Sequence, residues 1–185
     1  MAAGIDVKQR LTDGNSIFKR SVDPSVLSRL ARKQEPFVAI LTCSDSRVSP
    51  FKIFNLSLGD AFVVRVAGNS CSDPSVIGSL EYAVDHLHVR GLMVLGHTDC
   101  GAVRAVLDGH VTENLKKVAR DIERAQSKTS IDNANDANAI SESNVRLQIR
   151  ILADSSRIIG AAVSEGKLAL FGAMYDLGTG QVRFI

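Results

Sequence analysis

The chain has 185 residues, of which 45% are hydrophobic and 23% charged, and its formal net charge at pH 7 is +2. This composition is typical of a globular protein, and the absence of a basic run argues against nucleic-acid binding. No apolar run reaches the roughly 18 residues that a membrane-spanning helix needs, and the first residues lack the apolar segment of a secretory signal. We therefore expect a cytoplasmic protein with neither a nucleic-acid nor a membrane partner.

Cysteine usage supports a reducing compartment. The chain has three cysteines, and an odd number argues against a disulfide framework. Thiols that are not paired in a reducing compartment are available for metal binding or catalysis. Cys71 precedes a helix start and is interpreted as a small apolar filler.

The N-terminal part of the chain is expected to be a helical arm, residues 1–33. Its helical pattern is clearest in "SIFKRSVDPSVLSRLARK", and the Asp23–Pro24 pair predicts a break or a new helix start there. Together with the remainder, it is expected to make a single domain that covers residues 1–185. The stretch 127–144 is rich in Asn, Asp and Ser, which predicts a mobile surface loop.

Strands and helices alternate through the middle of the chain. Short apolar runs predict strands, and apolar residues at helical spacing predict the helices between them. The expected strands are 37–43, 61–68, a third that begins at 91, and two in 167–185; the expected helices are 71–88, 101–109 and 142–164. Alternation of this kind predicts an α/β fold with a mostly parallel central sheet flanked by helices. The last two strands are close enough to form a hairpin, so the C-terminal edge is expected to be antiparallel.

Polar side chains follow two of the expected strands. Cys43, Asp45 and Arg47 stand at alternate positions after the first, and His97 and Cys100 follow the third. Ligands in open parallel sheets gather beyond the carboxyl ends of the strands, so the two groups are expected to meet. Two thiolates and an imidazole are a zinc set, and three protein ligands leave a fourth position open, as in a catalytic zinc site.

Less specific interpretations of these residues remain open from the pattern alone. A single H-x-x-C motif is a weak metal signal, and Cys43 by itself is compatible with a buried core thiol. A structural zinc site, closed by a fourth protein ligand, is a further possibility.

Four stretches of the chain together carry a specific resemblance. They are "CSDSRVSP", "GDAFVVRVAGN", "IGSLEYAVDHLHVRGLMVLGHTDCGAV" and "LFGAMYDLGTGQV". In these motifs the chain resembles the β-class carbonic anhydrase family, in register from about Glu35 to the C-terminus. The pairing of C-x-D-x-R with H-x-x-C is the most specific part of the resemblance.

The resemblance implies an activity and a set of residue roles. The activity is reversible hydration of carbon dioxide to bicarbonate and a proton, by attack of zinc-bound hydroxide on CO2. One Zn²⁺ per chain would be held by Cys43, His97 and Cys100. Asp45 and Arg47 match the family's catalytic dyad, in which release of the aspartate lets it close the zinc site.

The resemblance also implies a substrate pocket and an assembly. Gln34, nine positions before Cys43, matches a glutamine that holds substrate in the plant-like branch of the family. Phe62 and Tyr82 match an aromatic pair that lines the pocket, and Ala67 falls at another pocket-lining position. The family pairs its subunits, so a homodimer or tetramer is expected.

Three alternatives stay open at the level of sequence. The same scaffold could hydrolyse COS or CS2, which are linear triatomic molecules like CO2. A zinc-binding structural or regulatory protein would have Asp45 permanently on the metal, although Arg47 is a ready partner that argues against this. A thiol redox protein would pair Cys43 with Cys100, but the chain lacks the C-x-x-C motif that this chemistry favours.

Overall fold

The computed structural model describes residues 6–185, which divide into two compact units with the boundary between Gln34 and Glu35. The interpretation as a single domain with an arm over residues 1–33 stays a prediction, and residues 1–5 of that arm lie outside the described residues. Among the residues that are described, no helix is long and apolar enough to cross a membrane.

The N-terminal unit contains two helices, α1 (Val7–Ser21) and α2 (Pro24–Leu30). The predicted break at Asp23–Pro24 is confirmed: Asp23 caps α2 by accepting a hydrogen bond from the Ser25 amide at 2.8 Å, and Pro24 occupies the first turn. Within these two helices no residue is buried. The apolar side chains of the arm therefore have no core of their own.

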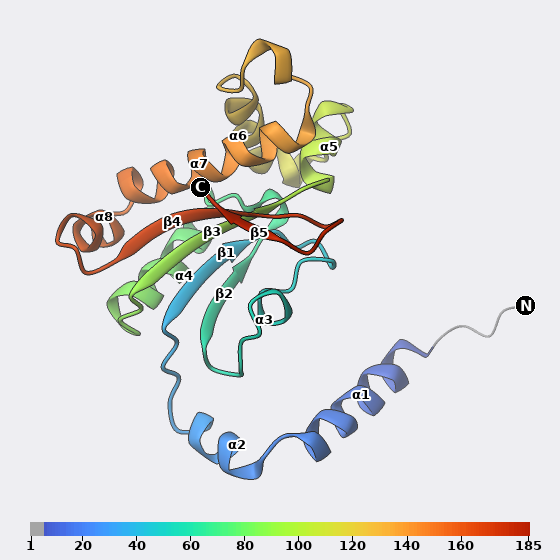
Figure 1. Ribbon diagram of the computed structural model, residues 1–185, viewed down its shortest axis with the longest axis vertical. Helices are drawn as coiled ribbons and strands as arrows, with labels where there is room; N and C mark the ends of the chain where they lie inside the picture. The colour runs from blue at the N-terminus through green and yellow to red at the C-terminus, as the bar shows by residue number, and fades with distance from the viewer. Residues whose placement is uncertain (1–5) are drawn as a thin grey trace, which may run out of the picture. The chain divides into compact units, whose positions relative to one another are not determined.

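The second unit is built on a five-stranded sheet (Figure 1). Its strands are β1 (Val38–Thr42), β2 (Ala61–Arg65), β3 (Gly91–His97), β4 (Ala169–Tyr175) and β5 (Val182–Phe184), in the order β2-β1-β3-β4-β5. The first three pairings are parallel and β4–β5 is antiparallel. The expected α/β class, the parallel sheet and the antiparallel C-terminal edge are confirmed.

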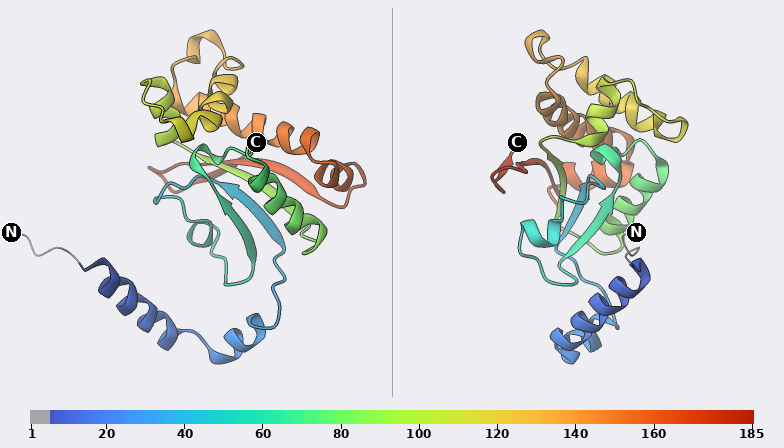
Figure 2. Two further views of the ribbon diagram at one scale, coloured as in Figure 1. Left: turned by 180° about the vertical axis from the view of Figure 1, so that it is seen from behind. Right: turned by 90° about the vertical axis from the view of Figure 1, so that its right-hand side faces the viewer.

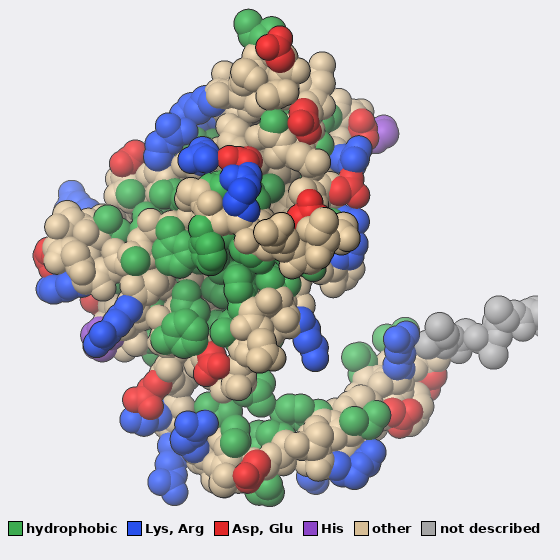
Figure 3. All heavy atoms as spheres, viewed as in Figure 1, with side chains coloured by type: hydrophobic (Ala, Val, Ile, Leu, Met, Phe, Trp, Pro, Cys, Tyr) green, Lys and Arg blue, Asp and Glu red, His purple; other side chains and the backbone are tan. Residues whose placement is uncertain are grey.

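Helices cover the sheet unequally (Figures 1 and 2). The helices α4 (Pro74–Asp85), α7 (Ala137–Ser155) and α8 (Arg157–Ser164) lie over one face, where alternate strand residues such as Leu41 and Leu92 pack against them. The opposite face, with Ile40 and Met93, is packed by the short helix α3 (Pro50–Ile53) and nearby loops. Apolar side chains remain visible over that second face (Figure 3).

A third apolar cluster lies beyond the carboxyl ends of the strands. It includes side chains of α5 (Gly101–Leu107) and α6 (Lys116–Gln126), together with Cys43 and Cys100. A short 3₁₀ segment at Glu113–Leu115 lies between α5 and α6, and another at Ile131–Asn133 lies between α6 and α7. Because the cluster surrounds the two thiols, it removes them from bulk solvent.

Two expected elements have different limits in the structure. The predicted loop 127–144 is too long, because α7 begins at Ala137, where Asp136 caps it by accepting a hydrogen bond from the Asn138 amide at 2.8 Å. Two of the polar residues that suggested a loop, Ser141 and Asn144, are buried on α7 and hydrogen-bonded. The predicted helix 142–164 is also interrupted at Ser156, whose side chain caps α8.

The strand predicted at 61–68 ends early, at Arg65. The chain leaves the sheet there and forms a 3₁₀ turn, Ala67–Asn69, in which Gly68 has a φ of +63°. A left-handed residue cannot continue a strand, and glycine adopts this conformation without steric cost. The turn brings the backbone of Gly68 back toward the end of β1.

Candidate metal centre

Three potential metal ligands converge at the carboxyl end of two neighbouring strands. Cys43 follows the last residue of β1, His97 is the last residue of β3, and Cys100 immediately precedes α5. The strands β1 and β3 are hydrogen-bonded neighbours with Thr42 opposite Leu95. Adjacent parallel strands deliver their following residues to one place, as the sequence pattern predicted.

The ligand atoms of this trio lie within 4.8 Å of one another. Ligand atoms that each lie about 2.0–2.3 Å from one zinc ion also fall within this distance of one another. Cys43 is 4% exposed, His97 0% and Cys100 2%. Two thiols and an imidazole enclosed in this way have the geometry to bind a metal ion.

The imidazole of His97 supplies an independent test of that fit. Its Nδ1 lies 2.8 Å from the carbonyl oxygen of Thr98, a contact that fixes Nδ1 as the protonated nitrogen and leaves Nε2 with a free lone pair. Among the described residues, Nε2 has no hydrogen-bond partner although it is buried. A buried polar atom without a partner is costly, and a metal ion would satisfy it.

The pKa directions of the trio describe a site that a cation would stabilise. A hydrogen bond with Cys100 lowers the pKa of Cys43, and the same contact, together with burial, raises the pKa of Cys100. Burial is the largest influence on the pKa of His97 and lowers it, but Cys43, the Thr98 carbonyl and Asp45 together outweigh burial, so the net shift of this pKa is upward. One thiol of the pair therefore ionises readily, and a positive charge is needed before both can do so.

Asp45 and Arg47 form a close ion pair at the rim of this trio. The Asp45 carboxylate accepts hydrogen bonds from Nη2 of Arg47 at 2.7 Å and from Nε at 3.0 Å. This contact holds the pKa of Asp45 well below its usual range. Oδ2 of Asp45 lies 4.0 Å from Nε2 of His97, so an ionised carboxylate borders the position that a metal would occupy.

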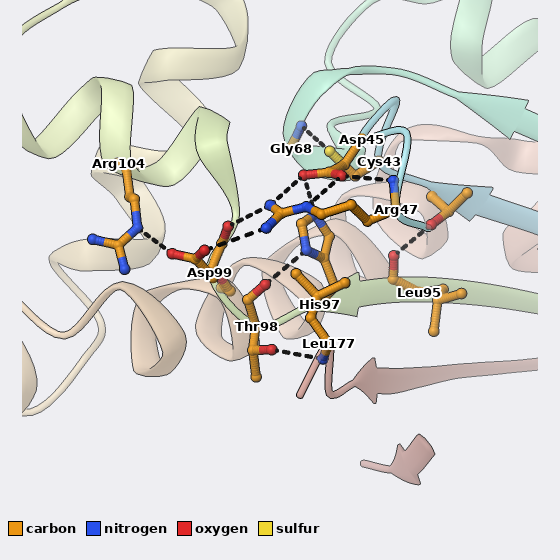
Figure 4. Close-up of polar contacts among 12 residues, drawn as sticks. Cys43, Asp45, Arg47, Gly68, Leu95, His97, Thr98, Asp99, Arg104 and Leu177 are labelled. Atoms are coloured by element: carbon orange, nitrogen blue, oxygen red, sulfur yellow. Dashed lines mark hydrogen bonds and ion pairs between the residues drawn. The ribbon is translucent and has the colours of Figure 1, made fainter. Parts of the chain in front are cut away.

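Arg47 also has a second acidic partner that sequence reasoning missed. Its guanidinium contacts the Asp99 carboxylate at 3.4 Å and donates to the Asp99 carbonyl at 3.1 Å. Figure 4 shows the guanidinium between the carboxylates of Asp45 and Asp99, with Arg104 bonded to the far side of Asp99. The one available signal was the position of Asp99 inside the H-x-x-C motif.

Two further residues that sequence reasoning missed hold the loop after β1. Arg65 donates to the carbonyl of Cys43 at 3.1 Å and to that of Asp45 at 2.7 Å. The amide of Gly68 donates to Sγ of Cys43 at 3.4 Å. The ligand loop is thus fixed from β2 and from the turn that follows it.

The expected pocket residues lie in several places. Phe62 on β2 and Tyr82 on α4 are neighbours, with ring centroids 6.1 Å apart, and Phe62 packs on the core cluster beneath α4 rather than on the cluster around the thiols. Ala67 begins the 3₁₀ turn that contains Gly68. Gln34 is the last residue of the N-terminal unit, and its substrate-holding role stays a prediction.

Fold and site together define a class of protein: an α/β metalloprotein with a buried Cys2His ligand set at the carboxyl edge of a parallel sheet. A family model described as "Carbonic anhydrase" matches residues 38–182. The chain belongs to the β-class carbonic anhydrase family, whose members use zinc.

Named relatives and solved structures agree with that assignment. The chain is 36% identical over 161 residues to carbonic anhydrase 2 of Mycobacterium tuberculosis, covering 82% of this chain and 75% of the relative. It is 34% identical over 190 residues to the carbonic anhydrase of Mycolicibacterium smegmatis, covering 94% and 89%. The β-carbonic anhydrase of Coccomyxa, solved with acetazolamide, superposes with a TM-score of 0.85 at 31% identity, covering 98% of this chain and 86% of that one.

A further structural neighbour bears on assembly. One of two β-carbonic anhydrases of Sordaria macrospora, described as tetrameric, has a TM-score of 0.84 at 27% identity, with 96% of this chain and 95% of that one covered. The family model, the relatives and the structural neighbours together show that the protein is a carbonic anhydrase. Its reaction is the reversible hydration of carbon dioxide to bicarbonate and a proton.

Proposed function

We propose that Asp45 and Arg47 are the catalytic dyad of this carbonic anhydrase. The observation that carries the proposal is the position of the Asp45 carboxylate, which lies 4.0 Å from Nε2 of His97 while two hydrogen bonds to Arg47 hold it. The carboxylate therefore borders the metal position without taking the place of a ligand.

Zinc, when bound by Cys43, His97 and Cys100, supplies Lewis acidity that lowers the pKa of a water molecule and provides a nucleophile near neutral pH. Asp45, kept ionised by Arg47, can only accept hydrogen bonds. It would accept one from the attacking water or hydroxide and so orient a lone pair toward the carbon of CO2. Arg47 would act through Asp45, by keeping the carboxylate charged and correctly turned.

The remaining pocket residues are proposed to bind the substrate. Gln34 would donate its side-chain amide to a CO2 oxygen as negative charge develops there. Phe62, Tyr82 and Ala67 would offer an apolar slot to a small, uncharged molecule. The contact between the Phe62 and Tyr82 rings supports their acting as one surface.

Hydration of CO2 and hydrolysis of COS or CS2 are distinguished by one set of assays. Zinc content would be measured on the same preparation as stopped-flow CO2 hydration between about pH 6 and pH 9, the range in which zinc-activated water ionises. Sulfide release from COS and CS2 would be followed in parallel. One zinc per chain with CO2 as the best substrate is expected; a zinc-free protein that is fully active would contradict the proposal.

We also propose that the protein is a homodimer or a tetramer. Apolar side chains stand exposed in both units: Leu11, Ile17 and Phe18 on α1, and Phe37 and Phe184 next to or within the sheet. Surfaces of this kind are typical of contacts between subunits, and the Sordaria relative is tetrameric. Light scattering after size exclusion should give a mass at least twice the 19.9 kDa of one chain.

A cytoplasmic location is proposed on the chemistry of the cysteines. None of Cys43, Cys71 and Cys100 is in a disulfide, and all three are buried. Thiols kept as metal ligands suit a reducing compartment. Fractionation of the source cells, with detection of the protein by antibody, tests the location directly.

A further inference from the structure

Two amides of α7 are buried behind the metal centre. Asn144 is 1% exposed and Gln148 is 0% exposed. Burying an amide without partners is costly, and both have partners at the oxygen and at the nitrogen. Nδ2 of Asn144 donates to the carbonyl of Gly68 at 2.8 Å, and Nε2 of Gln148 donates to Oδ1 of Asn144 at 2.9 Å. Oε1 of Gln148 in turn accepts from the amide of Cys71 at 2.8 Å.

Gly68 connects this chain of amides to a zinc ligand. Its carbonyl is held by Asn144, and its own amide donates to Sγ of Cys43 at 3.4 Å. The residue has a φ of +63°, and a Cβ placed on it would come within 3.3 Å of both Ile122 and Val118. Gly68 is therefore fixed on both sides of its Cα, by Asn144 on one and by Cys43 on the other.

We propose that Asn144 is a positioning residue for the metal centre, which acts through the backbone of Gly68. By holding the Gly68 carbonyl, it keeps the Gly68 N–H directed at the Cys43 sulfur. A hydrogen bond to a ligating thiolate orients it and withdraws electron density from it, which changes how strongly it donates to the metal. The proposal rests on zinc being bound by Cys43, His97 and Cys100.

If Asn144 only held the fold together, its loss would leave the metal centre unchanged. The residues that follow the Ala67–Asn69 turn are attached to the domain by other hydrogen bonds as well. The carboxylate of Asp121 on α6 accepts hydrogen bonds from the hydroxyls of Ser70 and Ser72 at 2.5 Å. These contacts do not involve Gly68. Loss of Asn144 should therefore leave the turn attached to the domain, while the Gly68 N–H is no longer held toward the Cys43 sulfur.

The main test variant is Asn144→Ser. The serine hydroxyl is too short to reach the Gly68 carbonyl, and it can bond to its own helix backbone, so the hydroxyl itself is not left unpaired. The Gly68 carbonyl and Nε2 of Gln148 each lose their bond to Asn144. We expect the variant still to bind one zinc at saturation but to release it to a chelator about 10-fold faster, the lower end of the effect of losing a partner that orients a ligand. With cobalt in place of zinc, the thiolate-to-metal charge-transfer band should move to longer wavelength.

Ser156→Ala is the matched control. Ser156 is also buried, its hydroxyl donates to Glu81 at 2.6 Å and accepts from the Ile159 amide at 3.1 Å, and it follows the same helix. Its loss should lower stability without changing zinc release or the cobalt band. Asn144→Leu is a second test variant, because its apolar side chain prevents a water molecule from replacing the lost donor.

The outcomes separate this inference from the proposed function. A band shift and faster zinc release in both Asn144 variants, absent from Ser156→Ala, support the positioning role. If the cobalt bands of both Asn144 variants coincide with those of the wild type and Ser156→Ala, the role is overturned. A wild-type protein that binds no zinc would instead contradict the proposed function, whatever the variants do.

Discussion

Each end of the parallel sheet carries a histidine among charged groups, and among the described residues only the histidine at the carboxyl end belongs to a candidate metal centre. At the carboxyl end, His97 is fully buried between two thiols and next to Asp45. At the amino end, His88 lines an open groove between α4 and α8 with Asp85, Glu165 and Lys167. There, Lys167 and Glu165 pair with each other at 2.6 Å while both remain well exposed.

The difference shows what makes a site from these residue types. Exposed charges are satisfied by water and by one another, and a surface pair contributes little. The buried trio at the carboxyl end has no such alternative, since Nε2 of His97 lacks a partner among the described residues. The two ends of the sheet therefore contain similar types of residue. They differ because the ligand atoms at the carboxyl end are buried and converge on one position.

The largest expected effect comes from removing a thiolate at the carboxyl end. Cys43→Ser or Cys100→Ser should lose zinc and more than about 100-fold of CO2 hydration, because a neutral hydroxyl is a much poorer zinc ligand and even the loss of an outer partner costs 10- to 100-fold. Zinc analysis and stopped-flow rates measure both effects. His88→Ala is the control at the amino end and should leave zinc content and rate near wild type. Losses in His88→Ala equal to those in the cysteine variants would show that the two ends do not differ in metal binding.

Arg47→Ala should separate metal binding from catalysis. Without its partner, Asp45 can turn onto the metal, so the rate should fall by about 100-fold, the size of losing one preorganised electrostatic group, while zinc is retained. A crystal structure of the variant should show a carboxylate oxygen about 2.0–2.2 Å from the zinc. Arg104→Ala is the control, since Arg104 contacts Asp99 but not Asp45; an unchanged rate in Arg47→Ala would make the ion pair purely structural.

Gln34→Ala should have a smaller effect, confined to the rate. Removing one donor to a developing oxyanion costs about 100- to 1000-fold where the donor is preorganised, and CO2 carries little charge, so we expect about 100-fold or less in kcat/KM. Zinc content and thermal stability should not change. Gln9→Ala, an amide change on the exposed helix α1, is the control. A loss of less than about twofold, which is well under 1 kcal/mol, would assign Gln34 to the surface.

The smallest effect concerns stability and an exposed carboxylate, Asp73 at the start of α4. Hydrogen bonds from the Ser75 hydroxyl at 2.6 Å and amide at 3.0 Å lower the pKa of Asp73 from 3.8 to about 2. A lowered folded-state pKa stabilises the fold above the unfolded value, and this stabilisation is lost as pH falls through the folded one. The urea midpoint of Asp73→Ala should therefore lie below wild type at pH 6, and the difference should shrink between about pH 4 and pH 2.

Ser75→Ala provides the graded comparison for Asp73. It removes the hydroxyl donor and keeps the amide, so it should show a smaller difference from wild type with the same pH dependence. The difference between variant and wild type is measured, because acid protonation of the zinc ligands affects both proteins alike. A difference that is independent of pH would show that the charge of Asp73 does not stabilise the helix.

Patterns that are local in the chain predicted most of the fold. Five strands, the break before Pro24 and the hairpin at Gly178–Gly180 follow from apolar runs and turn residues, which act within a few residues of one another. The start of α7 was missed, because Ser141 and Asn144 are polar yet buried. Their partners are the Ala137 carbonyl on the same helix and the Gly68 carbonyl far along the chain. No composition rule can anticipate a distant hydrogen bond of that kind.

The sequence by itself determined the ligand set and its chemistry, because Cys43, His97 and Cys100 follow strands whose parallel order is nearly obligatory for alternating strands and helices. Only the tertiary structure decided what surrounds those ligands. It placed Asp99 beside Arg47, Arg65 on the carbonyls of Cys43 and Asp45, and the Gly68 amide on the Cys43 sulfur. Ligand identity is a property of single side chains. These contacts instead depend on the positions of groups in distant segments of the chain, which only the packed fold determines.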